Sequence, residues 1–387
     1  MRSAILGVVL LLVGALAIAL GILPASEALG VGARVWPILL FVLAITVVTE
    51  LAAEAGLFVT VAERTASWGR GRGWLLWLLV LVLSVVSTVF LSLDTTAVLL
   101  TPVVILLARH VGLSPLPFAL TTVWMANTAS LLLPVSNLTN LLAVHELPAM
   151  TPLGFAVLMV APALVAVVVP ALLLFLIYRR QLTVRYERAE TTPTDDRVLL
   201  VASGATVVIL VPLLVSGIPV WMPALAAAAL LGAFFAARRP RVLRFSLVPW
   251  QLLLLASGLF IVVEAAHSLG LAAVLAAVSG TGDTPLELLR LSASGALGSN
   301  LVNNLPAYLA LEPVAGDPLR IAALLIGVNA GPLITPWASL ATLLWHDRLK
   351  SLGVEISWGR YVLLGLIAAP LTVAASTLAL AFAHPFA

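Results

Sequence analysis

NTASLLLPVSNLTNLL (127–142) and NAGPLITPWASLATLL (329–344) place amides, hydroxyls and a proline inside apolar, membrane-length sequence. Aligned without a gap, they pair Asn127 with Asn329, Pro134 with Pro336, Asn137 with Ser339 and Asn140 with Thr342. Paired, Pro-interrupted hydrophobic segments in corresponding halves are typical of transporters, because a broken helix frees backbone groups to meet a solute at mid-membrane. The pair predicts a secondary transporter.

The composition around these stretches predicts a polytopic membrane protein. Of 387 residues, 62% are hydrophobic and only 10% charged, which leaves too little polar surface for a soluble domain. The length allows roughly ten spans of about 20 residues. The net charge of +3 comes from basic residues in short loops, so we expect no nucleic-acid partner. Without cysteine, and without metal-ligand spacing of His, Asp or Glu, we expect no cofactor and no metal site.

The hydrophobic runs are predicted to be helices, beginning with a span at 4–22 rather than a signal peptide. Two long runs, 74–108 and 285–312, carry a polar kink and are predicted to be re-entrant hairpins. The broken helices fall at about 116–146 and 318–346. The chain thus predicts an all-α membrane protein with inverted-topology repeats, 1–180 and 198–387, joined by a cytoplasmic linker at 181–197.

Charge supports this topology. With both hairpins re-entrant, only Arg34, Arg290 and Arg320 of the 20 Lys and Arg residues face one side of the membrane. The positive-inside rule then assigns the other side to the cytoplasm. Treating either hairpin as a plain crossing would destroy this bias.

The candidate substrate site consists of neutral polar residues and one acid. An acid within a bilayer costs roughly 2.5 to 3.5 kcal/mol, so Asp94, at the first hairpin tip, is the first candidate for proton coupling. The alternative is that Asp94 only caps the helix beginning at Thr95. For the hydroxyls and amides, the alternative to solute binding is interhelical hydrogen bonding. The candidate residues are Asp94, Thr95, Thr96, Asn127, Ser130, Ser136, Asn137, Thr139, Asn140, Asn300, Asn303, Asn304, Asn329, Thr335, Ser339 and Thr342.

Glu50 and Glu264 are further candidates for proton coupling. Glu50 shares a helix face with Glu54, and Glu264 lies one turn before His267. Placement of both at the outer interface is the alternative.

Several motifs, in order along nearly the whole chain, resemble the bacterial arsenite/antimonite efflux permeases, or arsenical pump membrane proteins, of the ion transporter superfamily. The resemblance implies export of arsenite or antimonite across the bacterial cytoplasmic membrane, driven by proton exchange. It leaves open a cytoplasmic ATPase subunit and a homodimer. The motifs are WGRGRG (68–73), NTAS (127–130), VSNL (135–138), PWQ (249–251), NNLP (303–306), ITP (334–336) and SLATLLW (339–345).

The sequence departs from this family at its acids. The family usually has Asn-Asp-Gly where this chain has Leu93-Asp94-Thr95, and often has Asp at the positions of Asn127 and Asn329. The stretch from Leu91 to Pro102 also resembles the sodium/proton antiporter branch. A sodium-coupled anion carrier or a sodium/proton antiporter is therefore the alternative function. An enzyme is not expected, since we find neither a nucleophile with a base nor clustered acids.

Overall fold

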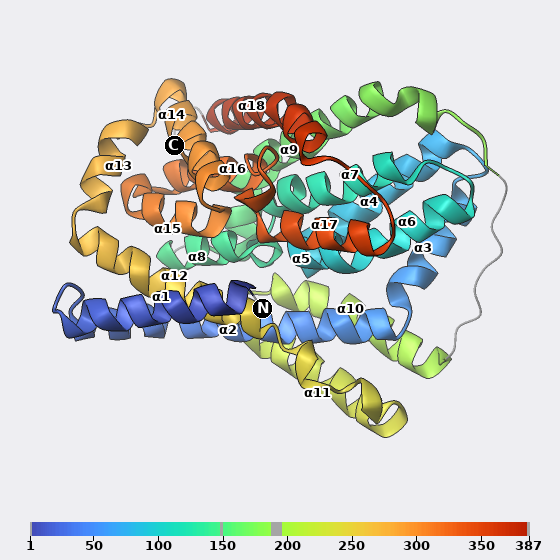
Figure 1. The fold of residues 1–387 in the computed structure, drawn as a ribbon, viewed down its shortest axis with the longest axis horizontal. Coiled ribbons are helices and arrows are strands. Elements are labelled where there is room, and N and C mark those ends of the chain that lie inside the picture. Colours follow the sequence, from blue (N-terminus) through green and yellow to red (C-terminus); the bar gives the residue numbers. More distant parts are fainter. Residues whose placement is uncertain (1, 148–149, 187–195, 385–387) are drawn as a thin grey trace.

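The computed structural model describes residues 2–147, 150–186 and 196–384 (Figure 1). Every extended regular element in these ranges is a helix, which confirms the predicted all-α membrane fold. Eight helices in these ranges are long and apolar enough to cross a bilayer. Along α9 (Pro152–Leu182), exposed Leu and Val side chains such as Leu164 and Val168 form an outer face suited to lipid.

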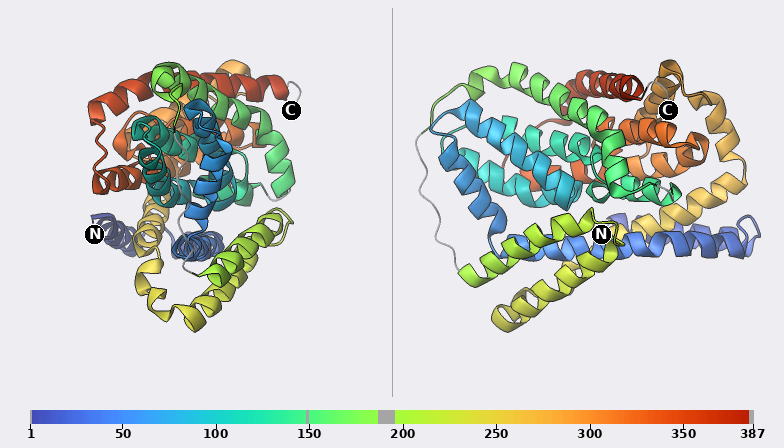
Figure 2. Two further views of the ribbon diagram at one scale, coloured as in Figure 1. Left: turned by 90° about the vertical axis from the view of Figure 1, so that its right-hand side faces the viewer. Right: turned by 180° about the vertical axis from the view of Figure 1, so that it is seen from behind.

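One group of helices, called here the layer, lies along one side of the molecule (Figures 1 and 2). It contains α1 (Arg2–Ala19), α2 (Ala25–Glu54), α10 (Arg197–Leu214), α11 (Trp221–Arg238) and α12 (Trp250–Ser268). Helix α1 packs closely on α12 because Gly7 and Gly258 meet there. A Cβ at Gly7 would lie 2.6 Å from the backbone of Leu254, so neither position has room for a side chain.

The remaining helices, called here the bundle, contain the first hairpin. It runs through α4 (Gly73–Leu91), turns at Ser92 and returns through α5 (Leu93–Thr95), a π-helical turn (Thr96–Leu100) and α6 (Thr101–His110). The turn holds Ser92 at φ +102°, a backbone region that side chains other than glycine rarely adopt. Two helices joined by a turn thus occupy the stretch at 74–108, and its re-entrant placement in the membrane stays a prediction.

The second hairpin consists of α14 (Pro285–Leu301) and α15 (Asn304–Ala315). Its turn lies at residues 302–303, inside the predicted polar kink. The re-entrant placement of the stretch at 285–312 likewise stays a prediction. Shorter helices precede the two hairpins, α3 (Leu57–Trp68) and α13 (Leu271–Ser279).

Both broken helices occur where the repeated sequence predicts them. The first is α7 (Pro115–Thr128) followed by α8 (Leu138–Glu146), and the second is α16 (Pro318–Ala330) followed by α17 (Leu340–Ser351). Proline lacks an N–H and forces the residue before it to be extended. Leu133 and Thr335, which precede Pro134 and Pro336, are indeed extended at ψ +152° and +149°.

The halves therefore follow the same order of elements, closed by α9 and by α18 (Trp358–Ala383). The repeat limits, 1–180 and 198–387, stay a prediction. The predicted linker at 181–197 begins inside α9, and residues 187–195 of it lie outside the described part.

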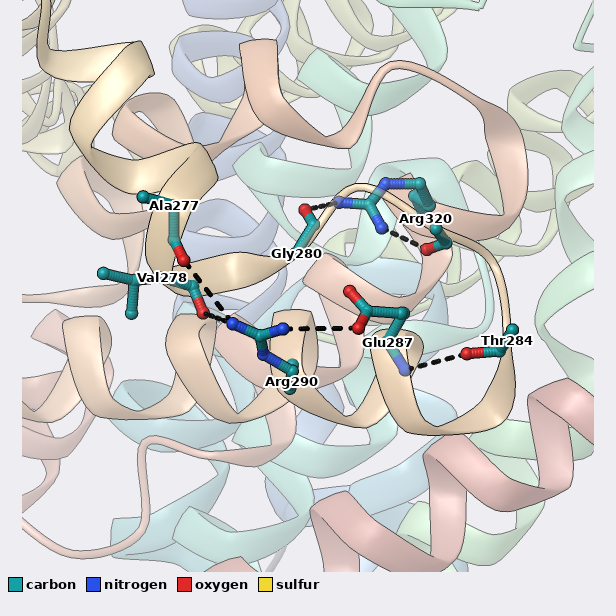
Figure 3. Close-up of polar contacts among 8 residues, drawn as sticks. Ala277, Val278, Gly280, Thr284, Glu287, Arg290 and Arg320 are labelled. Carbon is teal, nitrogen blue, oxygen red and sulfur yellow. Dashed lines mark hydrogen bonds and ion pairs between the residues drawn. The ribbon is translucent and has the colours of Figure 1, made fainter.

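Two of the three arginines assigned to the outer side are held by the second half of the bundle (Figure 3). Arg290 donates to Glu287 and to the last carbonyls of α13, at 3.2 Å to Val278 O. Arg320 is only 3% exposed and donates to four carbonyl oxygens, Gly280 O at 2.7 Å, Ala315 O at 3.0 Å, Val314 O at 3.3 Å and Gly282 O. Both cations thus hold the end of α13 and the connection from α13 to α14 in place.

Candidate functional site

A cavity of about 70 Å³ lies between the layer and the bundle. Its layer wall is almost wholly apolar, with Phe41 and Ile45 from α2 and Leu255 from α12. The bundle supplies the polar wall. That wall includes both hairpin tips and both breaks in the helices, in the form of Ser92, Asp94, Asn137, Thr139, Asn303, Asn304 and Ser339.

Four helices begin at this cavity. Their N-cap residues are Ser92, Asn137, Asn303 and Ser339, one from each hairpin and one from each broken helix. A helix N-terminus carries roughly half a positive elementary charge and exposed N–H groups. The polar wall therefore favours a solute that presents oxygen atoms, although no Lys or Arg lines the cavity among the described residues.

The four N-caps differ in one respect. The side chains of Ser92, Asn137 and Asn303 each accept a hydrogen bond from the backbone of their own helix. The hydroxyl of Ser339 is fully buried and has no hydrogen-bond partner in the described residues. A buried hydroxyl normally has a partner, so Ser339 is the N-cap with capacity for a solute.

Asp94 is the one ionisable residue in the described lining of this cavity. The N-cap of its helix is Ser92, which accepts from Thr95 N at 3.4 Å, so the alternative interpretation of Asp94 as the cap is wrong. No hydrogen bond or ion pair joins the Asp94 carboxylate to another described side chain.

Asn329 forms the centre of a buried amide cluster between the two broken helices. Its Oδ1 accepts from Asn137 Nδ2 and from Thr139 Oγ1, both at 2.9 Å, and its Nδ2 donates to Asn140 Oδ1 at 2.8 Å. Asn140 in turn donates to Ser130 O at 2.7 Å. The cluster lies directly behind the cavity wall and fixes the orientation of Asn137 and Thr139.

An equivalent contact joins the broken helices a second time. Asn127 Nδ2 donates to Thr342 Oγ1 at 3.4 Å and to Val123 O at 2.9 Å. Asn127 and Thr342 are the residues that the sequence alignment pairs with Asn329 and Asn140. The two amide contacts between the halves therefore join residues at equivalent positions of the repeated sequence.

The first hairpin is held by hydroxyls behind its tip. Thr96 Oγ1 donates to Ser87 Oγ and accepts from Thr88, each at 2.9 Å. Thr95 donates to the carbonyl oxygen of residue 91. Ser136, from the first break, donates to Val89 O at 2.8 Å and so attaches the break to the hairpin.

The second hairpin is attached to the second break by Asn300. Its Oδ1 accepts from Thr335 N at 2.9 Å, and its Nδ2 donates to Gly331 O at 2.8 Å. Asn303 donates to the carbonyl oxygen of Trp337 at 2.8 Å. Each hairpin tip is thus bound to the broken helix of its own half.

The structure therefore divides the sequence-derived candidates into two groups. Those that line the cavity are Asp94, Asn137, Thr139, Asn303, Asn304 and Ser339. Those that support its wall through hydrogen bonds or packing are Thr95, Thr96, Asn127, Ser130, Ser136, Asn140, Asn300, Asn329, Thr335 and Thr342. Ser92 lines the cavity but was missed, although its place in the polar kink was a usable signal.

Glu50 and Glu264 lie apart from this cavity and from each other. Glu50 is within electrostatic range of Arg348, which the predicted topology assigns to the cytoplasmic side, and its role in proton coupling stays a prediction. Glu264 lines a second cavity of about 470 Å³ on the predicted outer side, together with Arg34, Glu146, His267 and Glu312. Sequence reasoning missed Glu312, although an acid within a predicted hairpin was a sufficient signal.

Hairpins, broken helices and a polar cavity at the centre of an otherwise apolar protein define a membrane transporter. A sequence profile of the citrate transporter family, CitMHS, matches residues 3–342. The "Arsenical pump membrane protein" of Escherichia coli K12 is 31% identical over 360 residues, covering 86% of this chain and 83% of that protein. The protein of the same name in Yersinia enterocolitica is 30% identical over 395 residues, covering 91% and 88%. The chain belongs to this transporter family and is a multi-pass protein of the bacterial inner membrane.

A solved structure has the same fold. It is described as the YdaH transporter of Alcanivorax borkumensis with an unusual topology, and it matches with a TM-score of 0.58 at 16% identity, covering 98% of this chain and 97% of that one. The predicted fold class is confirmed by this likeness.

Proposed function

We propose that the protein exports trivalent arsenic or antimony, as arsenite or antimonite, from the cytoplasm by proton antiport with alternating access. The observation that carries this proposal is the cavity of about 70 Å³ at the meeting point of the two hairpins and the two broken helices. The names of the bacterial relatives support the choice of substrate.

The chemistry of the polar wall is suited to arsenite. Near neutral pH arsenite is an uncharged trihydroxide, whose hydroxyls can donate and accept hydrogen bonds. Asn304, Thr139 and Ser339 offer complementary neutral groups, and Asp94 can accept a proton or a hydrogen bond from a solute hydroxyl. No cysteine is present to hold trivalent arsenic tightly and slow its release.

The size of the cavity, about 70 Å³, supports a small solute such as a trihydroxide.

Proton antiport is assigned to Asp94. Since the carboxylate of Asp94 has no hydrogen-bond or ion-pair partner among the described side chains, proton binding and solute binding can alternate at the same place. A cytoplasmic ATPase subunit and a homodimer remain parts of the proposal, and light scattering of the purified protein tests the dimer.

A sodium-coupled anion carrier, or a sodium/proton antiporter, is the second candidate function. Four helix N-termini at one cavity favour an anion, and the family profile is that of citrate transporters. The deciding measurement is flux in proteoliposomes with an imposed pH gradient, with and without sodium. Arsenite flux that follows the pH gradient without sodium supports the first candidate. Citrate or proton flux that requires sodium, without arsenite flux, supports the second.

Resistance provides a test in cells. Expression in bacteria that lack their own arsenite exporter should raise arsenite resistance and lower retained arsenic. Unchanged resistance and unchanged arsenic content, with the protein present in the membrane, would count against arsenite export.

A further inference from the structure

Arg34 connects the layer to the bundle on the predicted outer side. It lies on α2, and its Nη2 contacts both carboxylate oxygens of Glu312 on α15 at 2.6 and 2.7 Å. Its Nε lies 3.0 Å from Glu146 Oε1 on α8. A single guanidinium thus joins the second hairpin and the first broken helix to the layer.

Glu312 is at the centre of this arrangement. Its side chain is 8% exposed, against 41% for that of Glu146. Besides Arg34, it accepts a hydrogen bond from Tyr308 Oη at 2.6 Å. A buried carboxylate held in this way requires its cation, because removing one partner leaves an uncompensated charge.

A polar stripe on α15 connects Glu312 with the substrate cavity. Asn304, Tyr308 and Glu312 are spaced by four residues and so lie on one face of the helix. Asn304 lines the cavity of about 70 Å³ and Glu312 lines the cavity of about 470 Å³. The stripe spans about 12 Å along the helix axis.

We infer that Glu312 is the outer proton-binding residue, and that its protonation releases the Arg34 bridge between the layer and the bundle. A proton and the guanidinium compete for the same carboxylate. Proton binding from outside is therefore linked to loss of the contact that holds the outer ends of α8 and α15 to α2. This inference rests on the proton antiport of the proposed function.

The other ionisable groups near the outer cavity are close enough to pass a proton to Glu312 or to change its proton affinity. They are Glu146 on α8, Glu264 and His267 on α12, and Tyr308 on α15. His267 already contacts the carbonyl oxygen of Ala310 at 3.2 Å. None of these four groups has what Glu312 has, which is both a tight bond to Arg34 and a position on the helix that leads to the substrate cavity.

The experiment uses thiol labelling, which the absence of native cysteine makes specific. Leu309→Cys places a thiol in the wall of the outer cavity at a side chain only 5% exposed. In proteoliposomes we expect the rate of its labelling by a charged maleimide, divided by the rate for Ser268→Cys at the same pH, to rise severalfold as the external pH falls from about 8 to about 5, the range above the pKa of an ordinary glutamate. Ser268→Cys, at an exposed outer position, corrects for the reagent's own pH dependence.

The decisive variant is Glu312→Gln, which mimics the protonated carboxyl. It should make labelling of Leu309→Cys fast at every pH, and arsenite flux should lose its dependence on the pH gradient. Glu287→Gln is the matched control, since Glu287 forms an exposed ion pair with Arg290 on the same side, and it should keep the native pH profile. Glu312→Asp should restore part of that profile.

Two results would overturn the inference: labelling of Leu309→Cys that is independent of pH in the otherwise native protein, or a pH profile that Glu312→Gln leaves unchanged. Labelling requires no solute, so its outcome stands even where arsenite flux is absent. Absent flux with a normal labelling profile would reject the proposed substrate and keep the role of Glu312.

Discussion

Asn137 and Asn329 lie 192 positions apart in the chain, and the amide of the first donates to the oxygen of the second at 2.9 Å. The bond ties the break of one helix to the break of the other in a fully packed environment. It also leaves Asn137 with one orientation, in which its Oδ1 caps α8. The stability of the protein and the geometry of its cavity thus depend on the same amides.

Asn329→Ala should therefore lower both stability and transport. It removes three side-chain hydrogen bonds, and at about 0.6 kcal/mol for an average interhelical bond in a membrane the loss is about 2 kcal/mol. Unfolding in detergent measures it. Thr128→Val is the control, because Thr128 donates only to the preceding turn of its own helix. Equal stability of the two variants would contradict the role of the cluster.

Ser339→Ala should separate stability from function. Its hydroxyl has no described partner to lose, so we expect the unfolding free energy to change by less than about 0.5 kcal/mol. Loss of one solute hydrogen bond should raise the KM for arsenite roughly tenfold, equal to about 1.4 kcal/mol. An unchanged KM would exclude Ser339 from the site.

Asp94→Asn should abolish the dependence of arsenite flux on the pH gradient. The amide keeps the size of the side chain but cannot take up a proton at neutral pH. If the variant still binds arsenite, it should still exchange internal for external arsenite without a pH gradient. Proteoliposomes loaded with arsenite measure the flux driven by the gradient and this exchange. Flux that still follows the pH gradient would remove Asp94 from the coupling role.

Arg320→Met should destabilise the outer side of the second half. Hydrogen bonds from a charged donor contribute about 1.5 to 3 kcal/mol each, and Arg320 donates to several buried carbonyls. We expect a loss of at least about 3 kcal/mol in detergent unfolding. Arg290→Met is the control, with a loss below about 1 kcal/mol because its ion pair is exposed. A similar loss in both would show that burial of Arg320 has little effect.

The assigned orientation is open to labelling as well. Ser268→Cys should react with an impermeant maleimide in intact cells, whereas Ser351→Cys, at the end of α17, should react only after the membrane is opened. Both positions are exposed. The reverse pattern would invert the topology.

Much of the fold was predictable because backbone groups inside a bilayer must be satisfied within helices. Pro134 and Pro336 marked the two breaks, and the kinks around Ser92 and Asn303 marked the hairpin turns, all within a few residues. Charge supplied an orientation, which stays a prediction. The limits of the repeats at 1–180 and 198–387 were also set from sequence and stay a prediction.

The candidate site was predictable as a set of residue types but not as a division of roles. Sequence cannot tell that the amide of Asn329 bonds to three neighbouring side chains, while the hydroxyl of Ser339, at a position equivalent to Asn137, has no hydrogen-bond partner among the described residues. Arg34 and Glu312 are 278 positions apart in the sequence, and no local sequence pattern predicts a contact at that separation.

The unequal walls of the central cavity have a mechanical consequence. Apart from Thr46 on α2, the polar groups that line the cavity belong to the bundle, while Phe41, Ile45 and Leu255 face them with hydrocarbon alone. Hydrocarbon contacts have no preferred direction and no hydrogen bond to break, so they oppose a sliding of the bundle along the layer only weakly. In the proposed alternating access, the bundle would move with its bound solute while the layer stays in place, and the bond between Arg34 and Glu312 would resist that movement.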